Sequence, residues 1–203
     1  MLATADLTGV ILAGGAGRRM GGRDKGLEPF AGKPLFAHTA MRLDGQVAEV
    51  LISANRNIDA YALFGWRVIE DAHPGFEGPL MGLYSALGAA RTPWLLIAPC
   101  DTPLLPQDLV ARMVAGLGDH AIAVAFDGER EHPAVALVRT ALKDDLGAAL
   151  AAGERKLSRW YARHGAAQID MADCVDAFAN LNTEEEKHQW ELRLLNGAQG
   201  VLP

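Results

Sequence analysis

Hydrophobic residues in this 203-residue chain fall into short runs that alternate with segments of helical periodicity. The runs of strand length predict β-strands at 9–13, 50–52, 66–69, 94–98, 121–125, 134–138 and 167–171. Apolar positions at helical spacing predict helices at 35–43, 80–90, 106–117, 140–152, 156–164 and 183–195. Apolar strands that are each followed by a helix are typical of a parallel sheet covered on both faces. The pattern therefore predicts a three-layer α/β fold.

Turn and cap signals refine this prediction. Asp127-Gly128 between two predicted strands indicates a hairpin, so the central sheet is expected to be mixed, though mostly parallel. Thr183 followed by Glu186 is a capping-box pattern that opens the last helix. With neither a linker nor a repeat, residues 1–195 are expected to form a single domain, and 196–203 a frayed tail.

Ligands of such folds bind at the carboxyl ends of the strands. The loops of interest therefore follow Ala13, Ile52, Ile69, Ala98 and Val138.

Composition and charge narrow the possible functions. The formal net charge is −6, which argues against binding to nucleic acid or to anionic membranes. Cys100 and Cys174 lie far apart and suit a reducing compartment; Cys100 is expected to pack in the core. The chain shows neither a basic signal segment nor an apolar run of about 18 residues, so we expect a cytoplasmic protein.

The loop after the first predicted strand, 12–25, contains five glycines and four cations. It matches neither the dinucleotide-binding fingerprint, because Met20 occupies the third glycine position, nor the Walker A loop, because Gly32-Lys33 is followed by proline. Glycines nevertheless let backbone N–H groups approach phosphate oxygens, and the cations neutralise them. Phosphate binding is the favoured interpretation, and a solvated turn is the alternative.

Two acidic positions end neighbouring apolar runs. Asp71 follows the third predicted strand and Asp101 the fourth, where carboxylates facing a triphosphate would be ligands for Mg²⁺. Alternatively, Asp71 begins a turn and Asp101 caps a helix. Gly78 and Gly82 flank the start of another helix, where free N–H groups can meet a phosphate or a base.

Taken together, these motifs resemble the molybdenum cofactor guanylyltransferase (MobA) family. The resemblance is carried by 12–25, Asn55-Arg56, Gly78-Pro79-Leu80 with Gly82, 99–103, His132-Pro133, 153–156 and 180–183, in order along nearly the whole chain. It implies a Rossmann-like nucleotidyltransferase fold, with a nucleotide-binding half at about 1–105 and a pterin-acceptor half at about 106–195. The implied reaction transfers GMP from GTP to molybdenum-molybdopterin, with Mg²⁺ as cofactor and pyrophosphate as the leaving group.

The resemblance also implies roles for individual residues. Asp101, Lys25 and Arg19 would be catalytic, and Asp101 would hold the metal. The nucleotide site would comprise Leu12, Ala13, Gly14, Gly15, Gly22, Lys25, Ser53, Asn55, Asp71, Gly78, Gly82 and Asp101. The pterin side would comprise Arg155, Lys156, Asn180 and Asn182. The family often has asparagine where this chain has Ser53, so either Ser53 or Asn55 could contact the nucleotide.

The family pattern also favours guanine over cytosine as the base of the nucleotide substrate. Related cytidylyl enzymes typically read Ala-Ala-Gly where this chain has Ala13-Gly14-Gly15, and the chain keeps Asp24-Lys25-Gly26. The alternatives are a cytidylyl- or sugar-directed transferase and a nucleotide-binding regulator without catalysis. Transient contacts with molybdenum-insertion proteins and molybdoenzyme chaperones are implied by the family alone, and a monomer is expected.

Overall fold

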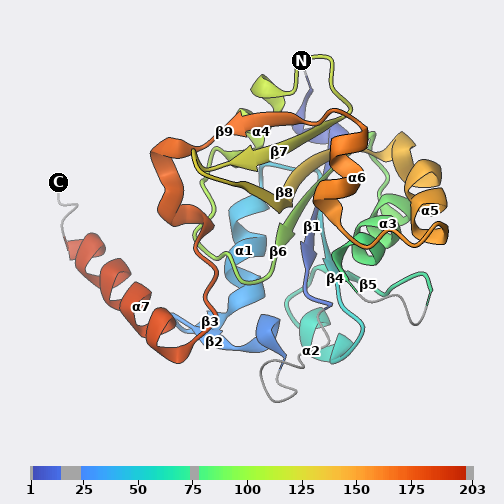
Figure 1. Ribbon diagram of the computed structural model, residues 1–203. Helices are drawn as coiled ribbons and strands as arrows, with labels where there is room; N and C mark the ends of the chain where they lie inside the picture. The colour runs from blue at the N-terminus through green and yellow to red at the C-terminus, as the bar shows by residue number, and fades with distance from the viewer. Residues whose placement is uncertain (1, 15–23, 74–77, 200–203) are drawn as a thin grey trace.

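The computed structural model describes residues 2–14, 24–73 and 78–199. Its centre is a seven-stranded sheet in the order β5-β4-β1-β6-β8-β7-β9 (Figure 1). The strands are β1 Leu7–Leu12, β4 Glu49–Ser53, β5 Arg67–Ile69, β6 Trp94–Pro99, β7 Ile122–Phe126, β8 Glu131–Arg139 and β9 Ala167–Asp170. Each predicted strand is present, with ends shifted by a few residues.

Strand direction confirms a mostly parallel, mixed sheet. β5, β4, β1 and β6 are mutually parallel, whereas β8 runs antiparallel to both β6 and β7, and β9 is parallel to β7. The carboxyl ends of six strands therefore meet at one edge. β8 is the reversed strand, so the loop after Val138 lies at the opposite edge, where Thr140 N donates to Pro93 O at 2.9 Å. The expectation that this loop faces the ligand is wrong, because the hairpin reverses β8.

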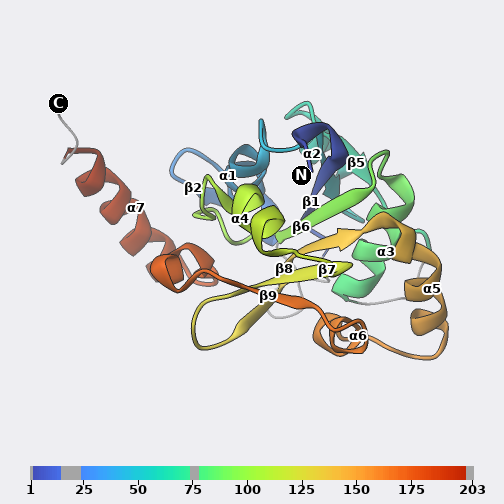
Figure 2. The same ribbon diagram turned by 90° about the horizontal axis from the view of Figure 1, so that it is seen from above.

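Helices cover both faces of the sheet and create two cores (Figures 1 and 2). One core joins alternate strand residues such as Ile11, Ile52 and Leu96 to α1 Leu35–Leu43 and α4 Leu109–Gly116. The other joins the intervening residues, such as Val10 and Leu51, to three helices. These are α3 Pro79–Ala89, α5 Lys143–Ala151 and α6 Leu157–Arg163. Side-chain alternation along each strand thus supplies both cores of a three-layer fold.

Smaller elements flank the sheet at its carboxyl edge. They include α2 Ile58–Ala62, the hairpin of β2 Pro29–Phe30 and β3 Lys33–Pro34, and a 3-10 segment at Ala172–Phe178. None of these was predicted, because each is too short to show a period. Within the described residues, no helix combines the length and apolar character needed to cross a membrane.

The last helix, α7, covers Glu184–Gln199 and extends away from the sheet in both views (Figures 1 and 2). The predicted capping box is present: Glu186 N donates to Thr183 Oγ1 at 3.1 Å, and Thr183 N donates to Glu186 Oε2 at 2.9 Å. The helix continues through 196–199, where a frayed tail was expected. The observed helix is therefore longer than the one predicted at 183–195, and residues 200–203 lie outside the described chain.

Candidate active site

Three segments that are distant in sequence meet at the carboxyl edge of the sheet. The ammonium of Lys25 donates hydrogen bonds to the carboxylate of Asp101 and to the side-chain oxygen of Asn182. The Lys25 and Asp101 side chains are 23% and 16% exposed, so a ligand can reach both groups. Two residues predicted for the nucleotide site and one predicted for the pterin side therefore form a single cluster.

Backbone hydrogen bonds position this cluster. Cys100 N donates to Leu12 O at 3.1 Å, which joins the end of β6 to the end of β1. Leu181 N donates to Asp101 O at 3.1 Å, which brings the approach to α7 onto the same loop. The Cys100 side chain points into the core, and burial raises the pKa of its thiol. Cys100 is therefore a packing residue next to Asp101, as predicted.

Asp24 holds the chain that carries Lys25. Its carboxylate accepts hydrogen bonds from Tyr61 Oη at 2.7 Å and Asn57 Nδ2 at 2.9 Å, and Arg56 Nε lies 3.4 Å away. This role was missed, although the position of Asp24 next to Lys25 in the family pattern pointed to it. Asp24 thus fixes the start of the Lys25 turn against α2 and the loop before it.

Gly26 is required by the same packing. A Cβ at this position would collide with the Tyr61 hydroxyl and would lie 3.2 Å from the Tyr61 ring carbon Cζ. Tyr61 is fully buried and cannot move aside easily. The glycine after Lys25 therefore lets the 3-10 turn Lys25–Leu27 approach the buried ring.

A second group of predicted residues lies where β1 and β4 end. Ala13 N donates to Ser53 O at 2.8 Å, and a Cβ at Gly14 would come within 3.1 Å of Asn55 Nδ2. Ser53 is buried, whereas Asn55 is exposed at the edge. This arrangement favours Asn55 over Ser53 as the side chain that reaches a nucleotide.

Asn55 and Asp71 form a reciprocal pair. Asn55 Nδ2 donates to Asp71 Oδ2 at 2.7 Å, and Asp71 N donates to Asn55 Oδ1 at 2.8 Å. Burial raises the pKa of Asp71, and the Asn55 hydrogen bond opposes this shift. Asp71 follows β5 and Asp101 follows β6, and these two strands are three strand spacings apart in the sheet, about 14 Å. This separation favours Asp101 alone as the metal ligand.

Gly78 is the N-cap of α3, and Gly82 lies near the start of the same helix. Gly78 has φ +118°, a conformation that glycine adopts without strain, and its missing Cβ faces Arg155 O at 3.9 Å. A Cβ at Gly82 would meet Leu12 Cδ2 at 3.1 Å. These glycines therefore bring the N-terminus of α3 against both the end of β1 and the loop that contains Arg155.

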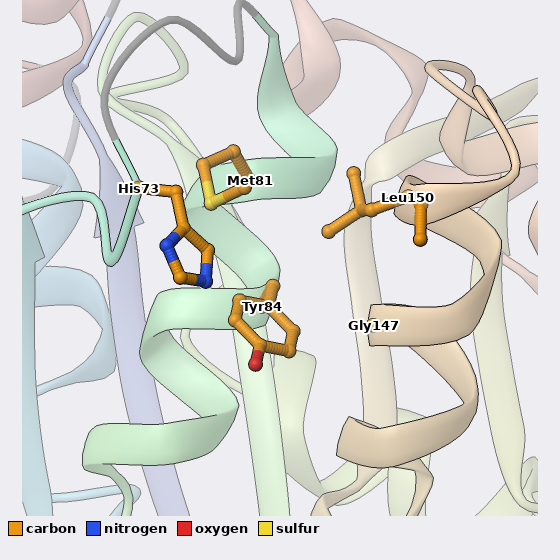
Figure 3. Close-up of a pocket in the computed structure, with 6 residues that line it drawn as sticks. His73, Met81, Tyr84, Gly147 and Leu150 are labelled. Atoms are coloured by element: carbon orange, nitrogen blue, oxygen red, sulfur yellow. The ribbon is translucent and has the colours of Figure 1, made fainter.

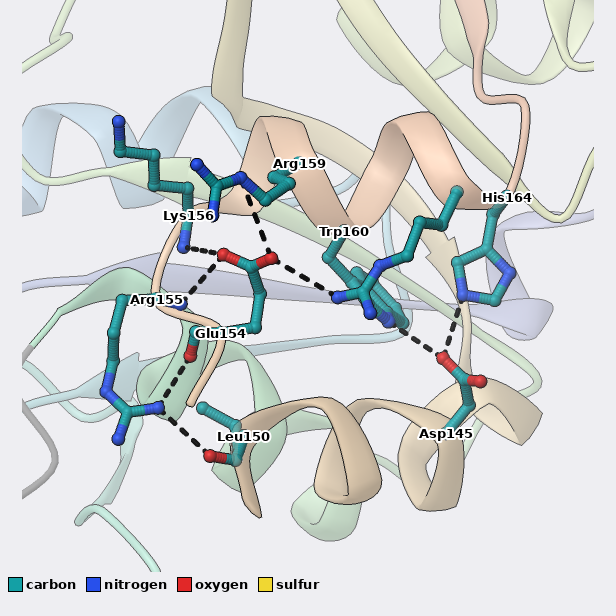
Figure 4. Close-up of polar contacts among 9 residues, drawn as sticks. Asp145, Leu150, Glu154, Arg155, Lys156, Arg159, Trp160 and His164 are labelled. Carbon is teal, nitrogen blue, oxygen red and sulfur yellow. Dashed lines mark hydrogen bonds and ion pairs between the residues drawn. The ribbon is translucent and has the colours of Figure 1, made fainter. Parts of the chain in front are cut away.

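Arg155 and Lys156 are organised by Glu154 (Figure 4). The Glu154 carboxylate accepts hydrogen bonds from the backbone N–H of Arg155 at 2.9 Å and of Lys156 at 3.0 Å. These bonds lower the pKa of Glu154, with the Lys156 N–H as the largest cause. The Arg155 guanidinium donates to Leu150 O and Glu154 O, and Arg155 and Lys156 are both exposed residues.

The rest of the pterin-side prediction lies on the approach to α7. Asn180 is exposed and its carbonyl accepts a hydrogen bond from Asn182 Nδ2 at 3.3 Å. His132, part of the motif His132-Pro133, bonds Asp127 at 2.7 Å and stacks on Phe178 with ring centroids 4.6 Å apart. His132 therefore supports the chain segment that leads to Asn180.

The chemistry of Asp101 fits a magnesium ion. Mg²⁺ is usually held by one or two carboxylates together with substrate phosphates, and not by a closed protein cage. Across the described ranges, no group of three His, Cys, Asp or Glu side chains could enclose a metal. The Asp101 carboxylate already accepts a cationic partner, the Lys25 ammonium, which shows that a cation can reach this oxygen. The residues present therefore fit a metal bound jointly by Asp101 and a phosphate ligand.

A separate cavity of about 300 Å³ lies between α3 and α5 (Figure 3). It is lined by His73, Met81, Tyr84, Gly147, Leu150 and Ala151. Among the described residues, the lining includes neither lysine nor arginine and no residue of the predicted site, so it does not suit a triphosphate. Of the residues that the resemblance implied, Gly15, Arg19 and Gly22 lie outside the described part of the chain.

Comparisons with known proteins place the chain in a family. Residues 9–168 match the model of the MobA-like NTP transferase domain. A molybdenum cofactor guanylyltransferase from Shewanella sp. strain MR-4 is 51% identical over 182 residues, covering 89% of this chain and 92% of that protein. The protein of the same name from Shewanella baltica strain OS155 is 48% identical over 193 residues, covering 94% and 98%.

Solved structures show the same fold at low identity. Molybdopterin-guanine dinucleotide biosynthesis protein A from Archaeoglobus fulgidus superposes with a TM-score of 0.73 at 20% identity, covering 93% of this chain and 99% of that one. The 4-diphosphocytidyl-2C-methyl-D-erythritol synthase from Anaerococcus prevotii gives 0.72 at 10% identity, covering 95% and 97%.

The fold and its edge cluster define a nucleotidyltransferase, as the matched domain does. Within this class, the identity to named relatives over most of the chain is decisive. The chain belongs to the molybdenum cofactor guanylyltransferase family.

Proposed function

We propose that the protein transfers GMP from GTP to molybdenum-molybdopterin, forming molybdopterin guanine dinucleotide and releasing pyrophosphate. Relatives at about half identity carry the name of this activity. The observation that carries the proposal is the meeting of Lys25 and Asp101 at the carboxyl edge of the sheet. A cationic and an acidic group side by side suit a triphosphate together with its metal ion.

The reaction needs alignment and charge neutralisation more than proton transfer. The nucleophile is the terminal phosphate of molybdopterin, which is largely ionised near neutral pH, so no general base is required. Lys25 and Arg19 hold the phosphates that leave as pyrophosphate, and Asp101 holds Mg²⁺. When bound, Mg²⁺ neutralises charge that develops on the phosphates. Asp24 holds the backbone next to Lys25 in place through its contacts with Tyr61 and Asn57.

The two sides of the site take different substrates. We expect Asn55 and Asp71, which hydrogen-bond to each other, to contact the nucleotide, and the N-terminus of α3 at Gly78 to meet a phosphate or the base. On the acceptor side, Arg155 and Lys156 are both exposed, and the Arg155 guanidinium donates to two carbonyl oxygens. We therefore assign contact with the acceptor phosphate to Lys156 and loop positioning to Arg155, with Asn180 and Asn182 completing that side.

Pyrophosphate release tests this proposal. With Mg²⁺ and molybdenum-loaded molybdopterin, release is expected with GTP and not with CTP. Asp101→Ala should slow release at least about 100-fold, because the metal contributes several kcal/mol of transition-state stabilisation. Asp119→Ala, which removes an exposed carboxylate before β7 at the opposite edge, is the matched control.

Each alternative has its own outcome in this assay. Faster release with CTP would support a cytidylyl transferase. Tight GTP binding without release would support a regulatory protein that lacks catalysis. Unchanged turnover of Asp101→Ala would remove Asp101 from the metal role.

We further propose that the protein acts in the cytoplasm as a monomer and contacts molybdenum-insertion proteins and molybdoenzyme chaperones transiently. Family membership supports this setting. Light scattering coupled to size exclusion measures the oligomeric state, with a single species of 21.6 kDa expected.

A further inference from the structure

The Lys25 ammonium contacts the carboxylate of Asp101, the same group that is expected to bind the metal ion. It donates to Asp101 Oδ2 and, on its other side, to Asn182 Oδ1. Both side chains of the ion pair are partly buried, with exposed fractions of 23% and 16%. The lysine is therefore held in place by two oxygen acceptors from different segments.

A divalent cation competes with this arrangement. An ammonium and a metal ion repel each other at contact distance, and repulsion between partly buried charges is only partly screened. Asp101 carries one negative charge, which Lys25 already neutralises. The remaining described part of the chain offers no cluster of three metal-ligating side chains as an alternative.

We propose that Lys25 occupies the cation position of Asp101 in the nucleotide-free protein, so that a divalent ion gains this carboxylate only when a triphosphate draws the lysine away. Lys25 then has two successive partners. It pairs with Asp101 before the nucleotide binds and with phosphate oxygens afterwards. Asn182 acts as a positioning residue in the first state, because its side-chain oxygen keeps the ammonium at Asp101.

The inference rests on the proposed function in one respect: the anion that displaces Lys25 from Asp101 is the triphosphate of the nucleotide. The competition between Lys25 and a metal is a property of the free protein. It distinguishes Lys25 from a lysine that contacts phosphate alone, whose removal would leave metal binding in the absence of nucleotide unchanged.

The test is a titration of the full-length protein with Mn²⁺, followed by electron paramagnetic resonance of the free ion, without nucleotide or acceptor. Lys25→Gln removes the positive charge, so Mn²⁺ affinity should rise at least about tenfold. Lys25→Arg keeps the charge, so its affinity should stay near the wild-type value. Asn182→Ala, which releases the ammonium from one anchor, should give a smaller gain.

Two further variants identify the site. In Lys25→Gln/Asp101→Asn the gain should disappear, because Asp101 supplies the ligand. Arg56→Gln removes a neighbouring cation that pairs with Asp24, and it should not produce the gain. A similar rise in Arg56→Gln would point to a general charge effect and would overturn the proposal.

The proposal would also be overturned by equal Mn²⁺ affinities of the wild type and Lys25→Gln. Failure of GMP transfer leaves this titration untouched, since it contains neither GTP nor acceptor. Conversely, equal affinities would leave the proposed reaction standing. The two claims can therefore fail separately.

Discussion

Lys187→Met removes a buried positive charge that joins α7 to the N-terminal half of the chain. Lys187 Nζ lies 3.1 Å from Glu28 Oε2, and the two side chains are only 4% and 9% exposed. The same ammonium also donates to Glu184 Oε1 at 2.7 Å, but Glu184 is 71% exposed. Burial disfavours the charged form, yet the hydrogen bonds to Glu184 and Glu28 outweigh it and raise the pKa of Lys187. The ion pair is therefore intact at neutral pH.

The burial of the Lys187–Glu28 ion pair determines how much the substitution should lower the free energy of unfolding. Removing one partner of a buried ion pair costs about 3–5 kcal/mol, whereas an exposed pair contributes about 0–1 kcal/mol. Lys187→Met should therefore lower the free energy of unfolding by about 3–5 kcal/mol. For a chain of this size, that corresponds to a decrease in Tm of about 6–20 °C. Glu184→Gln, which removes only the exposed partner, should change stability by less than about 1 kcal/mol.

Urea unfolding followed by circular dichroism measures the global loss. Amide hydrogen exchange in α7 detects a loss confined to this helix, which would appear as reduced protection there. In the double variant Glu28→Met/Lys187→Met much of the stability should return, because apolar residues of similar volume replace both charges. A change below 1 kcal/mol in Lys187→Met, with unaltered exchange in α7, would refute the argument that burial sets the strength of this pair.

Two other predictions concern local packing and pH. Gly26→Ala should lose about 1–3 kcal/mol of stability through its clash with Tyr61, and Tyr61→Phe should rescue part of that loss; additive losses in a thermal-unfolding cycle would contradict the clash. The pKa of Asp127 is far below its usual value because Arg130 N, Glu129 N and His132 donate to its carboxylate. A lowered carboxyl pKa stabilises the fold above the unfolded pKa of about 3.9, and this contribution is lost as pH falls toward the folded pKa. The stability difference between the wild type and Asp127→Asn should therefore shrink as the pH falls from 6 to 3. Urea unfolding at each pH measures it, and a difference in urea midpoint that stays constant would contradict the lowered pKa of Asp127.

Much of the fold could be predicted from local patterns. The helix at 35–43 agrees with α1 residue for residue, because its apolar positions recur at helical spacing. The β7–β8 hairpin follows from Asp127-Gly128, where Gly128 adopts φ +96°. The α2 helix, with five residues, is too short to show helical spacing, and β2 and β3, with two residues each, are too short to form an apolar run, so these elements escaped prediction.

The site was predictable in its residue types and less so in its contacts. The resemblance selected Lys25, Asp101 and Asn182, but it assigned them to phosphate, metal and pterin separately. The structure joins them through hydrogen bonds across 76 and 157 residues of sequence. Asp24 and Glu154 were overlooked as organising groups because their partners come from other segments or from the backbone.

Local sequence determined where strands and helices form and which chemistry is available, since propensity, capping and turn conformation depend on near neighbours. Three features could be recognised from the sequence in this way: the glycine-rich stretch, the acidic strand ends and the family pattern. Only the tertiary structure decided that β8 runs antiparallel to its neighbours, that Asp71 pairs with Asn55, and that Lys25 donates to the carboxylate of Asp101. Strand order, strand direction and burial are settled by packing between distant segments, and these set the distances between charges.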